Sequence, residues 1–170
     1  PTMPVSDRLR AELAFRIRTR APVEWTEFSG LWMAFNALYG GEPDARERAR
    51  VMGCIRRSLS EASALRVLRS VTKHIDKILD VPPGNMMLDR YNPNFRAAST
   101  RCAALYRDRN ESARGRLAGV GGVLYQVRCN LIHGSKDPNT PRDRMLVQES
   151  LAILGALLPA LEASLTANAA

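Results

Sequence analysis

The sequence has few of the residues from which most catalytic and metal sites are built. It contains only two histidines, His74 and His133, and three cysteines that are not spaced as a disulfide framework. Without a His-Glu-x-x-His or Cys-x-x-Cys motif, we expect no zinc site, and we predict neither a metal nor another cofactor. A Gly-x-x-x-x-Gly-Lys-Ser/Thr phosphate loop and a Gly-x-Ser-x-Gly motif are also absent.

The number of cysteines and the hydropathy of the chain indicate the cellular compartment of the protein. An odd number of cysteines fits a reducing environment better than secretion, and no signal peptide is recognisable. No uninterrupted apolar run reaches the length of about 20 residues that a membrane span needs. We therefore expect a cytoplasmic protein with no membrane partner. Its length of 170 residues predicts one domain, over residues 3–168.

Lysine is scarce, yet the chain is strongly basic. Lys and Arg together number 25 against 17 Asp and Glu, which gives a net charge of +8, and only Lys73, Lys77 and Lys136 are lysines. The arginine fork matches phosphate groups in a bidentate way, which favours RNA or nucleotides as partners. An arginine-rich proteome would give the same balance on any solvated surface, so both interpretations stay open.

Apolar residues recur at helical spacing along most of the chain, and no segment of useful length alternates with a period of two. Prolines place an irregular loop at residues 82–95, and Pro159 predicts a kink or an early end of the last helix near Gly155. Short connections favour an all-α fold, an up-and-down bundle of about five longer helices and one or two short ones. The predicted helices cover residues 6–21, 23–39, 44–59, 60–80, 95–108, 117–132 and 143–165.

Three local patterns have a structural and a functional interpretation. Five aromatic residues share one face of the helix at 23–39, which indicates core packing, with a base-stacking surface as the lesser alternative. Arginines fill the helix at 44–59, either as a solvated face or as a track for the RNA backbone. His74 is expected to be an exposed surface histidine, and the glycines at 119–122 indicate close helix packing. The aromatic residues are Trp25, Phe28, Trp32, Phe35 and Tyr39.

The stretch Tyr125–Lys136, YQVRCNLIHGSK, is the one that suggests chemistry. Arg128 lies only about 70° from the centre of the apolar stripe of its helix, so it must be held by a partner. Gly134 is expected to end the helix, which leaves His133 in the last turn. An imidazole there can exchange protons with a ribose hydroxyl while the arginine holds the phosphate. A salt-bridged arginine beside a C-cap histidine is the alternative.

Two segments resemble the HEPN (higher eukaryotes and prokaryotes nucleotide-binding) superfamily. The first is Tyr125–Gly134, YQVRCNLIHG, which resembles the arginine-then-histidine signature near the end of a late helix. The second is Trp32–Gly40, WMAFNALYG, which resembles the early helix of the Apea-like branch. The resemblance implies a homodimeric endoribonuclease in which two arginine–histidine pairs form one cleft. It makes Arg128 the phosphate-binding residue and His133 the acid/base group.

Other residues are assigned supporting roles. The family often has a polar residue directly after the arginine; here Cys129 stands there, and Asn130 is expected to take over the polar role. Asn36 and Lys136 complete the supporting or substrate-binding set. Cys129 also lies four residues before His133, but nothing nearby marks it as an activated thiolate.

Three functions follow as hypotheses. The first is a metal-independent endoribonuclease with a toxin, anti-phage or RNA-processing role, cutting RNA by 2′-OH attack, with an antitoxin or regulatory protein as a further partner. The second is a non-catalytic RNA- or nucleotide-binding module that uses the same arginines. The third is a helical interaction or regulatory domain, in which Arg128 and His133 only stabilise the helix end.

Overall fold

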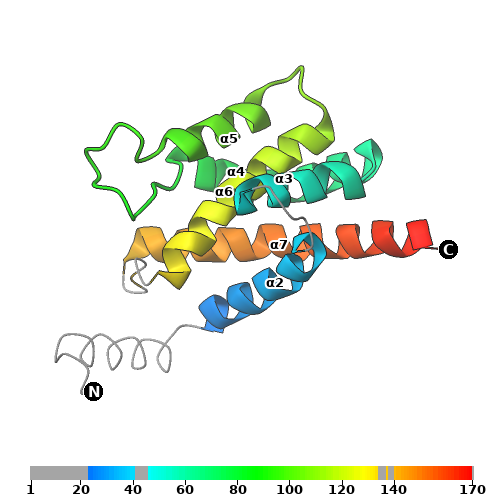
Figure 1. The fold of residues 1–170 in the computed structure, drawn as a ribbon, viewed down its shortest axis with the longest axis horizontal. Helices are drawn as coiled ribbons and strands as arrows, with labels where there is room; N and C mark the ends of the chain where they lie inside the picture. Colours follow the sequence, from blue (N-terminus) through cyan, green and yellow to red (C-terminus); the bar gives the residue numbers. More distant parts are fainter. Residues whose placement is uncertain (1–22, 41–45, 134–136, 138–139, 170) are drawn as a thin grey trace.

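The computed structural model describes residues 23–40, 46–133, 137 and 140–169 (Figure 1). All regular structure in these residues is helical, which confirms the predicted all-α bundle. The helix predicted at 6–21, with Gly134 and Lys136, lies outside the described residues. The helices are α2 (Val23–Tyr39), α3 (Glu47–Ser58), α4 (Glu61–Asp80), α5 (Ala97–Arg107), α6 (Ala113–Ile132) and α7 (Pro141–Ala169).

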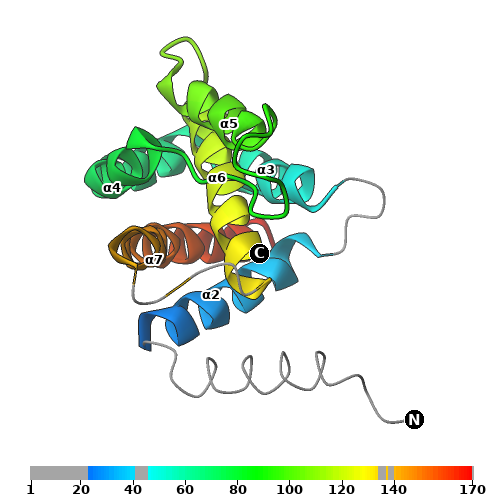
Figure 2. The same cartoon turned by 90° about the vertical axis from the view of Figure 1, so that its left-hand side faces the viewer.

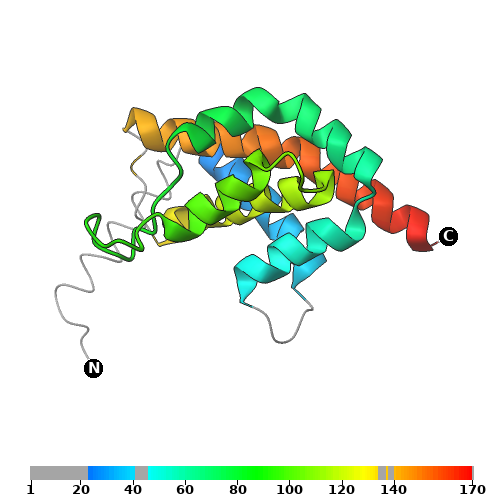
Figure 3. The same cartoon turned by 90° about the horizontal axis from the view of Figure 1, so that it is seen from above.

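Helix α6 is the central element of the bundle. It packs against α3, α4 and α5, while α7 lies between α2 and α4 (Figure 2). From α3 to α7 each helix runs roughly opposite to the one before it, in the expected up-and-down order, although the long loop at 81–96 rather than a short connection joins α4 to α5 (Figure 3). The apolar faces of all six helices meet in one hydrophobic core.

Glycines on α6 allow its neighbours to come close. A Cβ atom at Gly119 would lie 2.5 Å from the carbonyl oxygen of Cys102 on α5, and one at Gly121 would lie 2.5 Å from Ile55 Cδ1 on α3. Side chains there would push the helices apart. The glycine cluster is therefore a packing surface, as the sequence indicated.

The aromatic face of α2 is buried in the core. All five residues are at most 5% exposed, and Trp32 packs edge-on against Phe35 and Tyr39 with ring centroids 5.4 and 6.3 Å apart. Burial of this depth confirms core packing, and the alternative of a base-stacking surface on α2 is wrong.

Helix α7 departs from the prediction at Pro159. The helix continues past Pro159 to Ala169, so of the two alternatives predicted near Gly155, a kink or an early end, the early end is wrong. Proline removes the hydrogen bond that would reach the carbonyl of Gly155, but both residues lie on the exposed side, where water can take that place.

By length and composition, Pro141–Ala167 of α7 is long and apolar enough to cross a membrane, although charged residues interrupt its apolar run. Its buried side chains, such as Leu146, Ile153 and Leu161, belong to the core that α7 shares with α2 and α4. These contacts account for part of the apolar content of the helix, because 28% of its apolar window is buried inside the bundle.

Candidate functional site

Arg128 is held at the edge of the core, as its place on α6 predicted. Its side chain is 23% exposed, and Nη1 donates a hydrogen bond to Oε2 of Glu47 on α3 at 3.3 Å. The Nε atom is buried and has no hydrogen-bond partner within the described part of the chain. The guanidinium is therefore fixed by one carboxylate and retains donors for a second acceptor.

Glu47 is itself fixed by a chain of hydrogen bonds from α2. The Tyr39 hydroxyl donates to Glu47 Oε1 at 3.0 Å, and Trp32 Nε1 donates to the Tyr39 oxygen at 3.0 Å. Burial raises the pKa of Tyr39, and the bond to Glu47 and its charge raise it further. The phenol therefore stays protonated at neutral pH and serves as a permanent donor to the carboxylate.

Sequence reasoning missed Glu47 as a functional residue. It lies 81 positions from Arg128, and no local pattern can reveal a pairing over that distance. One signal was present: Glu47 is the single carboxylate inside the arginine-rich segment Ala45–Arg57. A single carboxylate in an arginine-rich segment is a candidate for an ion pair with an arginine.

His133 forms the C-cap of α6, immediately after Ile132. Its backbone N–H donates to the carbonyl oxygen of Cys129 at 3.1 Å, and its side chain is exposed. No hydrogen bond joins the imidazole to Arg128 among the residues that the structure describes. One chain thus brings the two predicted catalytic residues to the same helix end without placing them in direct contact.

Asn130 faces inward and connects a loop to α6. It is 3% exposed, and its Oδ1 accepts from Gln126 Nε2 at 3.0 Å and from the backbone N–H of Met86 at 3.3 Å. Its Nδ2 donates to the carbonyl oxygen of Gly84 at 2.8 Å. The amide that was expected to assist the substrate is occupied in holding the loop at 81–96.

The same network continues into the basic helix α3. Arg48 donates from Nη2 to Gln126 Oε1 at 2.6 Å and from Nη1 to the carbonyl oxygen of Gly122 at 3.1 Å. Its guanidinium also lies 5.2 Å from the centre of the Tyr125 ring. Arg48 is therefore a structural residue, whereas Arg56 on the same helix is exposed.

Two predicted site residues remain, Asn36 and Lys136. Asn36 is exposed on α2, and no described hydrogen bond joins its side chain to Arg128 or His133. Lys136 falls outside the described residues.

Tyr125 lies beside Arg128 and Cys129 on α6. Burial raises the pKa of Tyr125, and the hydrogen bond between Tyr125 and Cys129 raises it further.

His74 lies at the surface as expected, with its side chain 40% exposed, but it has a partner that the sequence did not reveal. Its Nδ1 lies 2.5 Å from Oε2 of Glu149 on α7, and Lys77 Nζ lies 2.7 Å from the other oxygen. Burial alone would raise the pKa of Glu149, but hydrogen bonds from Lys77 and His74 outweigh it and lower the pKa. This cluster joins α4 to α7.

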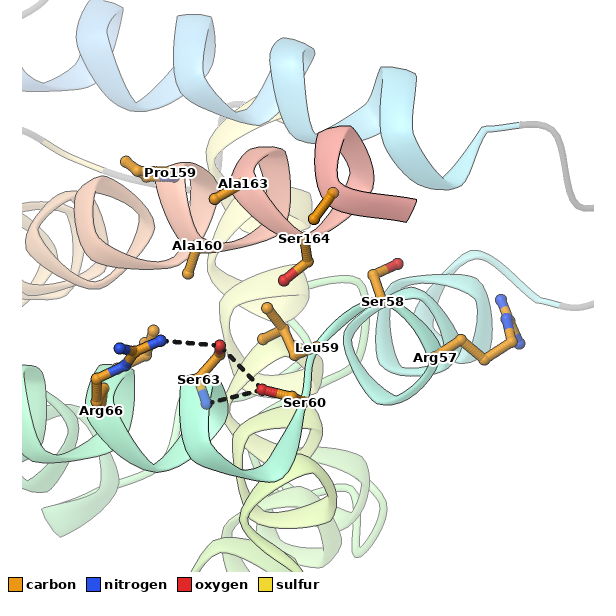
Figure 4. Close-up of a pocket in the computed structure, with 12 residues that line it drawn as sticks. Arg57, Ser58, Leu59, Ser60, Ser63, Arg66, Pro159, Ala160, Ala163 and Ser164 are labelled. Carbon is orange, nitrogen blue, oxygen red and sulfur yellow. Dashed lines mark hydrogen bonds between the residues drawn. The ribbon is translucent and has the colours of Figure 1, made fainter. Parts of the chain in front are cut away.

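A groove of about 790 Å³ lies elsewhere, between the start of α4 and the second half of α7 (Figure 4). Its lining includes Arg66, which donates to Ser63 Oγ at 3.1 Å, and the small residues Ala160 and Ala163. Neither Arg128 nor His133 lines it. Within the described residues, no group of three or more His, Cys, Asp or Glu side chains is arranged to hold a metal ion.

Comparison with known proteins leaves this site without a relative. No family model, no curated protein and no solved structure matches the chain.

Proposed function

We propose that the protein is a metal-independent endoribonuclease of HEPN type, with a toxin, anti-phage or RNA-processing role. The observation that carries the proposal is the end of α6, where a carboxylate-anchored Arg128 precedes an exposed His133 in a chain of net charge +8. The resemblance of YQVRCNLIHG to the HEPN signature supports the same assignment. RNA is the substrate and the cytoplasm is the proposed location.

The proposed reaction needs only these two side chains. His133 accepts the proton of a ribose 2′-OH, and the 2′-oxygen attacks the adjacent phosphorus. The bond from phosphorus to the 5′-oxygen breaks, and the leaving oxygen receives a proton from an imidazolium. Arg128 stabilises the charge that builds on the phosphate oxygens. The products are a 2′,3′-cyclic phosphate and a 5′-hydroxyl.

Glu47 determines which N–H donors of Arg128 are available to bind the RNA phosphate. A guanidinium has five N–H donors, and the carboxylate uses one of them at 3.3 Å. The carboxylate fixes the plane of the fork before RNA arrives, which lowers the cost of ordering it in the transition state. The phosphate then binds to the donors that Glu47 leaves available.

We also propose that the active form is a homodimer. In one chain, no hydrogen bond in the described region joins the imidazole of His133 to Arg128, and the histidine is exposed at a helix end. Two copies that meet through this end would place two arginine–histidine pairs in one cleft, as the family resemblance implies. An antitoxin or regulatory protein that covers the cleft is a further proposed partner.

Incubation of the purified protein with RNA in the presence of a chelator tests the proposal. We expect cleavage by the wild-type protein and a rate lowered about 100- to 1000-fold in Arg128→Ala, the scale for loss of a transition-state donor. Arg128→Lys keeps the charge but loses the fork, so it should recover only part of the rate. Cleavage that persists in both Arg128→Ala and His133→Ala would contradict the proposal.

Two non-catalytic functions remain as rivals, and one structural observation favours them. Glu47 already neutralises Arg128 in part, as in a simple structural ion pair. An RNA- or nucleotide-binding module predicts salt-sensitive binding without turnover. A helical interaction or regulatory domain predicts that the double alanine variant loses stability and no nucleic-acid affinity.

A further inference from the structure

The loop at residues 81–96 between α4 and α5 has a defined structure. Its two ends meet where the backbone N–H of Asn85 donates to the carbonyl oxygen of Phe95 at 2.6 Å. Gly84 packs against the Phe95 ring so closely that a Cβ atom would lie 2.1 Å from Cε1. Side-chain oxygens of Asn85, Asp89 and Asn92 each accept from the backbone N–H two residues later. The loop is thus pre-organised by its own hydrogen bonds.

Asn130 fixes this loop beside the candidate site. Its amide bonds to Gly84 and Met86 at 2.8 and 3.3 Å, and it lies between Arg128 and His133 in the sequence of α6. Figure 3 shows the green loop next to the yellow end of α6, where the helix terminates. The loop and the two proposed catalytic residues therefore occupy the same end of the bundle.

The loop exposes side chains that are normally buried. Tyr91 is 78% exposed and is the only exposed aromatic residue within the described ranges, and Met87 is 69% exposed. The guanidinium of Arg90 lies 4.7 Å from the centre of the Tyr91 ring and is hydrogen-bonded to its hydroxyl. An aromatic ring with an arginine across it is the arrangement on which unpaired nucleic-acid bases stack.

We propose that this loop is a stacking site for an unpaired base of single-stranded RNA. Tyr91 stacks on an unpaired base of the strand that Arg128 holds, and Arg90 neutralises a phosphate next to that base. The inference rests on the proposed function for its substrate, and it adds that the enzyme selects unpaired RNA. A duplex keeps its bases stacked on one another, so Tyr91 cannot insert without unpairing them.

The charge of the loop favours RNA over a protein partner. Arg90 and Arg96 both lie against aromatic rings, Arg96 at 5.5 Å from the centre of the Phe95 ring. The carboxylate of Asp89 accepts from the backbone N–H of Tyr91 at 2.8 Å, so it is engaged in the turn. With two arginines against the one exposed carboxylate of Asp89, the exposed surface is aromatic, apolar and weakly basic, which suits a base and its phosphate together.

Binding of a fluorescent single-stranded RNA oligonucleotide in a His133→Ala background tests the proposal without cleavage. Adding Tyr91→Ala should weaken this binding about 5- to 100-fold, the loss expected for one stacked base. Tyr91→Trp should retain the affinity because it keeps a stacking ring. A perfectly paired duplex of the same sequence should bind with similar affinity whether or not the protein carries Tyr91→Ala. Leu165→Ala, at an exposed position on the far half of α7, is the matched control and should change neither affinity.

Each result has one meaning. Equal affinity of Tyr91→Ala and the Tyr91 protein for the single strand overturns the stacking site, even if the wild-type protein cleaves RNA. An equal loss for duplex and single strand also overturns it, because it indicates general charge or folding. Wild-type binding of neither RNA overturns it and leaves the exposed loop as a protein-docking surface. Tyr91-dependent binding without any cleavage by the wild-type protein supports the site and rejects only the ribonuclease.

Discussion

The two histidines lie in opposite relations to two carboxylates, Glu149 and Glu47, each of which joins two helices. Glu149 binds His74 and Lys77 and so connects α7 to α4. Glu47 binds Arg128 and connects α3 to α6, while His133 at the end of α6 stays exposed. In the first cluster the carboxylate occupies the histidine; in the second it fixes the arginine and leaves the histidine available. The first arrangement suits stability, and the second suits chemistry.

The largest predicted effect is a difference in RNA cleavage rate between alanine variants of the two histidines. His133→Ala should lower the rate of RNA cleavage about 100- to 10,000-fold, because the acid/base group is lost. His74→Ala should leave the rate unchanged, since it removes one partner of Glu149 far from the proposed chemistry. Gel-based cleavage rates of the two variants, with circular dichroism to show that both are folded, measure the contrast. Equal losses would contradict the assignment of His133.

Glu149→Gln should have the largest effect on stability. The carboxylate side chain is 11% exposed and has Lys77 and His74 as hydrogen-bond partners, so its loss should lower the free energy of unfolding by about 1–3 kcal/mol. Urea unfolding at neutral pH measures the difference. RNA cleavage by the folded variant should be unchanged, and a loss of activity at full folding would contradict the comparison.

The stability contribution of Glu149 should depend on pH. Its folded-state pKa lies below the ordinary value of 4.5, so the folded state favours the charged form. The contribution is therefore present above pH 4.5 and is lost as the pH falls through the folded-state value. The difference between the wild type and Glu149→Gln should shrink over this acidic range in unfolding experiments. A difference that grows with acidification would contradict the sign.

Tyr39→Phe should have the smallest effect, and it probes the anchor of Arg128. Loss of the hydroxyl removes the donor to Glu47 and the acceptor of Trp32 Nε1, so it should lower the unfolding free energy by about 1–2 kcal/mol. We also expect a lower cleavage rate with little change in RNA affinity, because the guanidinium is less well positioned. Steady-state kinetics with kcat and KM measured separately check this. An unchanged kcat would show that Glu47 has no positioning role.

The sequence predicted the helices well where one face is strongly apolar. The helix at 23–39 matches α2 because its aromatic residues recur at helical spacing, and the helix predicted at 60–80 matches α4. The predicted loop at 82–95 also lies between α4 and α5. The helix predicted at 143–165 passes through Pro159, but the sequence did not decide between a kink and an early end there, because the exposure of Gly155 is known only once the helix is packed.

The site was predictable in part. The position of Arg128 near the apolar stripe of its helix predicted that its side chain has a partner, and in the structure that partner is Glu47. The identity of that partner, like the pairing of His74 with Glu149, joins residues more than 70 positions apart, which only tertiary structure brings together. Asn130 was predicted to support the substrate, but its amide bonds to the loop at 81–96 because the chain folds back over the end of α6.

End-group analysis of RNA cleaved in the presence of a chelator tests the central claim most directly. The proposed attack by the 2′-oxygen predicts fragments that end in a 2′,3′-cyclic phosphate and begin with a 5′-hydroxyl. These fragments should be absent with His133→Ala and present with His74→Ala. Fragments with a 5′-phosphate, or no cleavage by the wild-type protein, would contradict the account of Arg128 and His133.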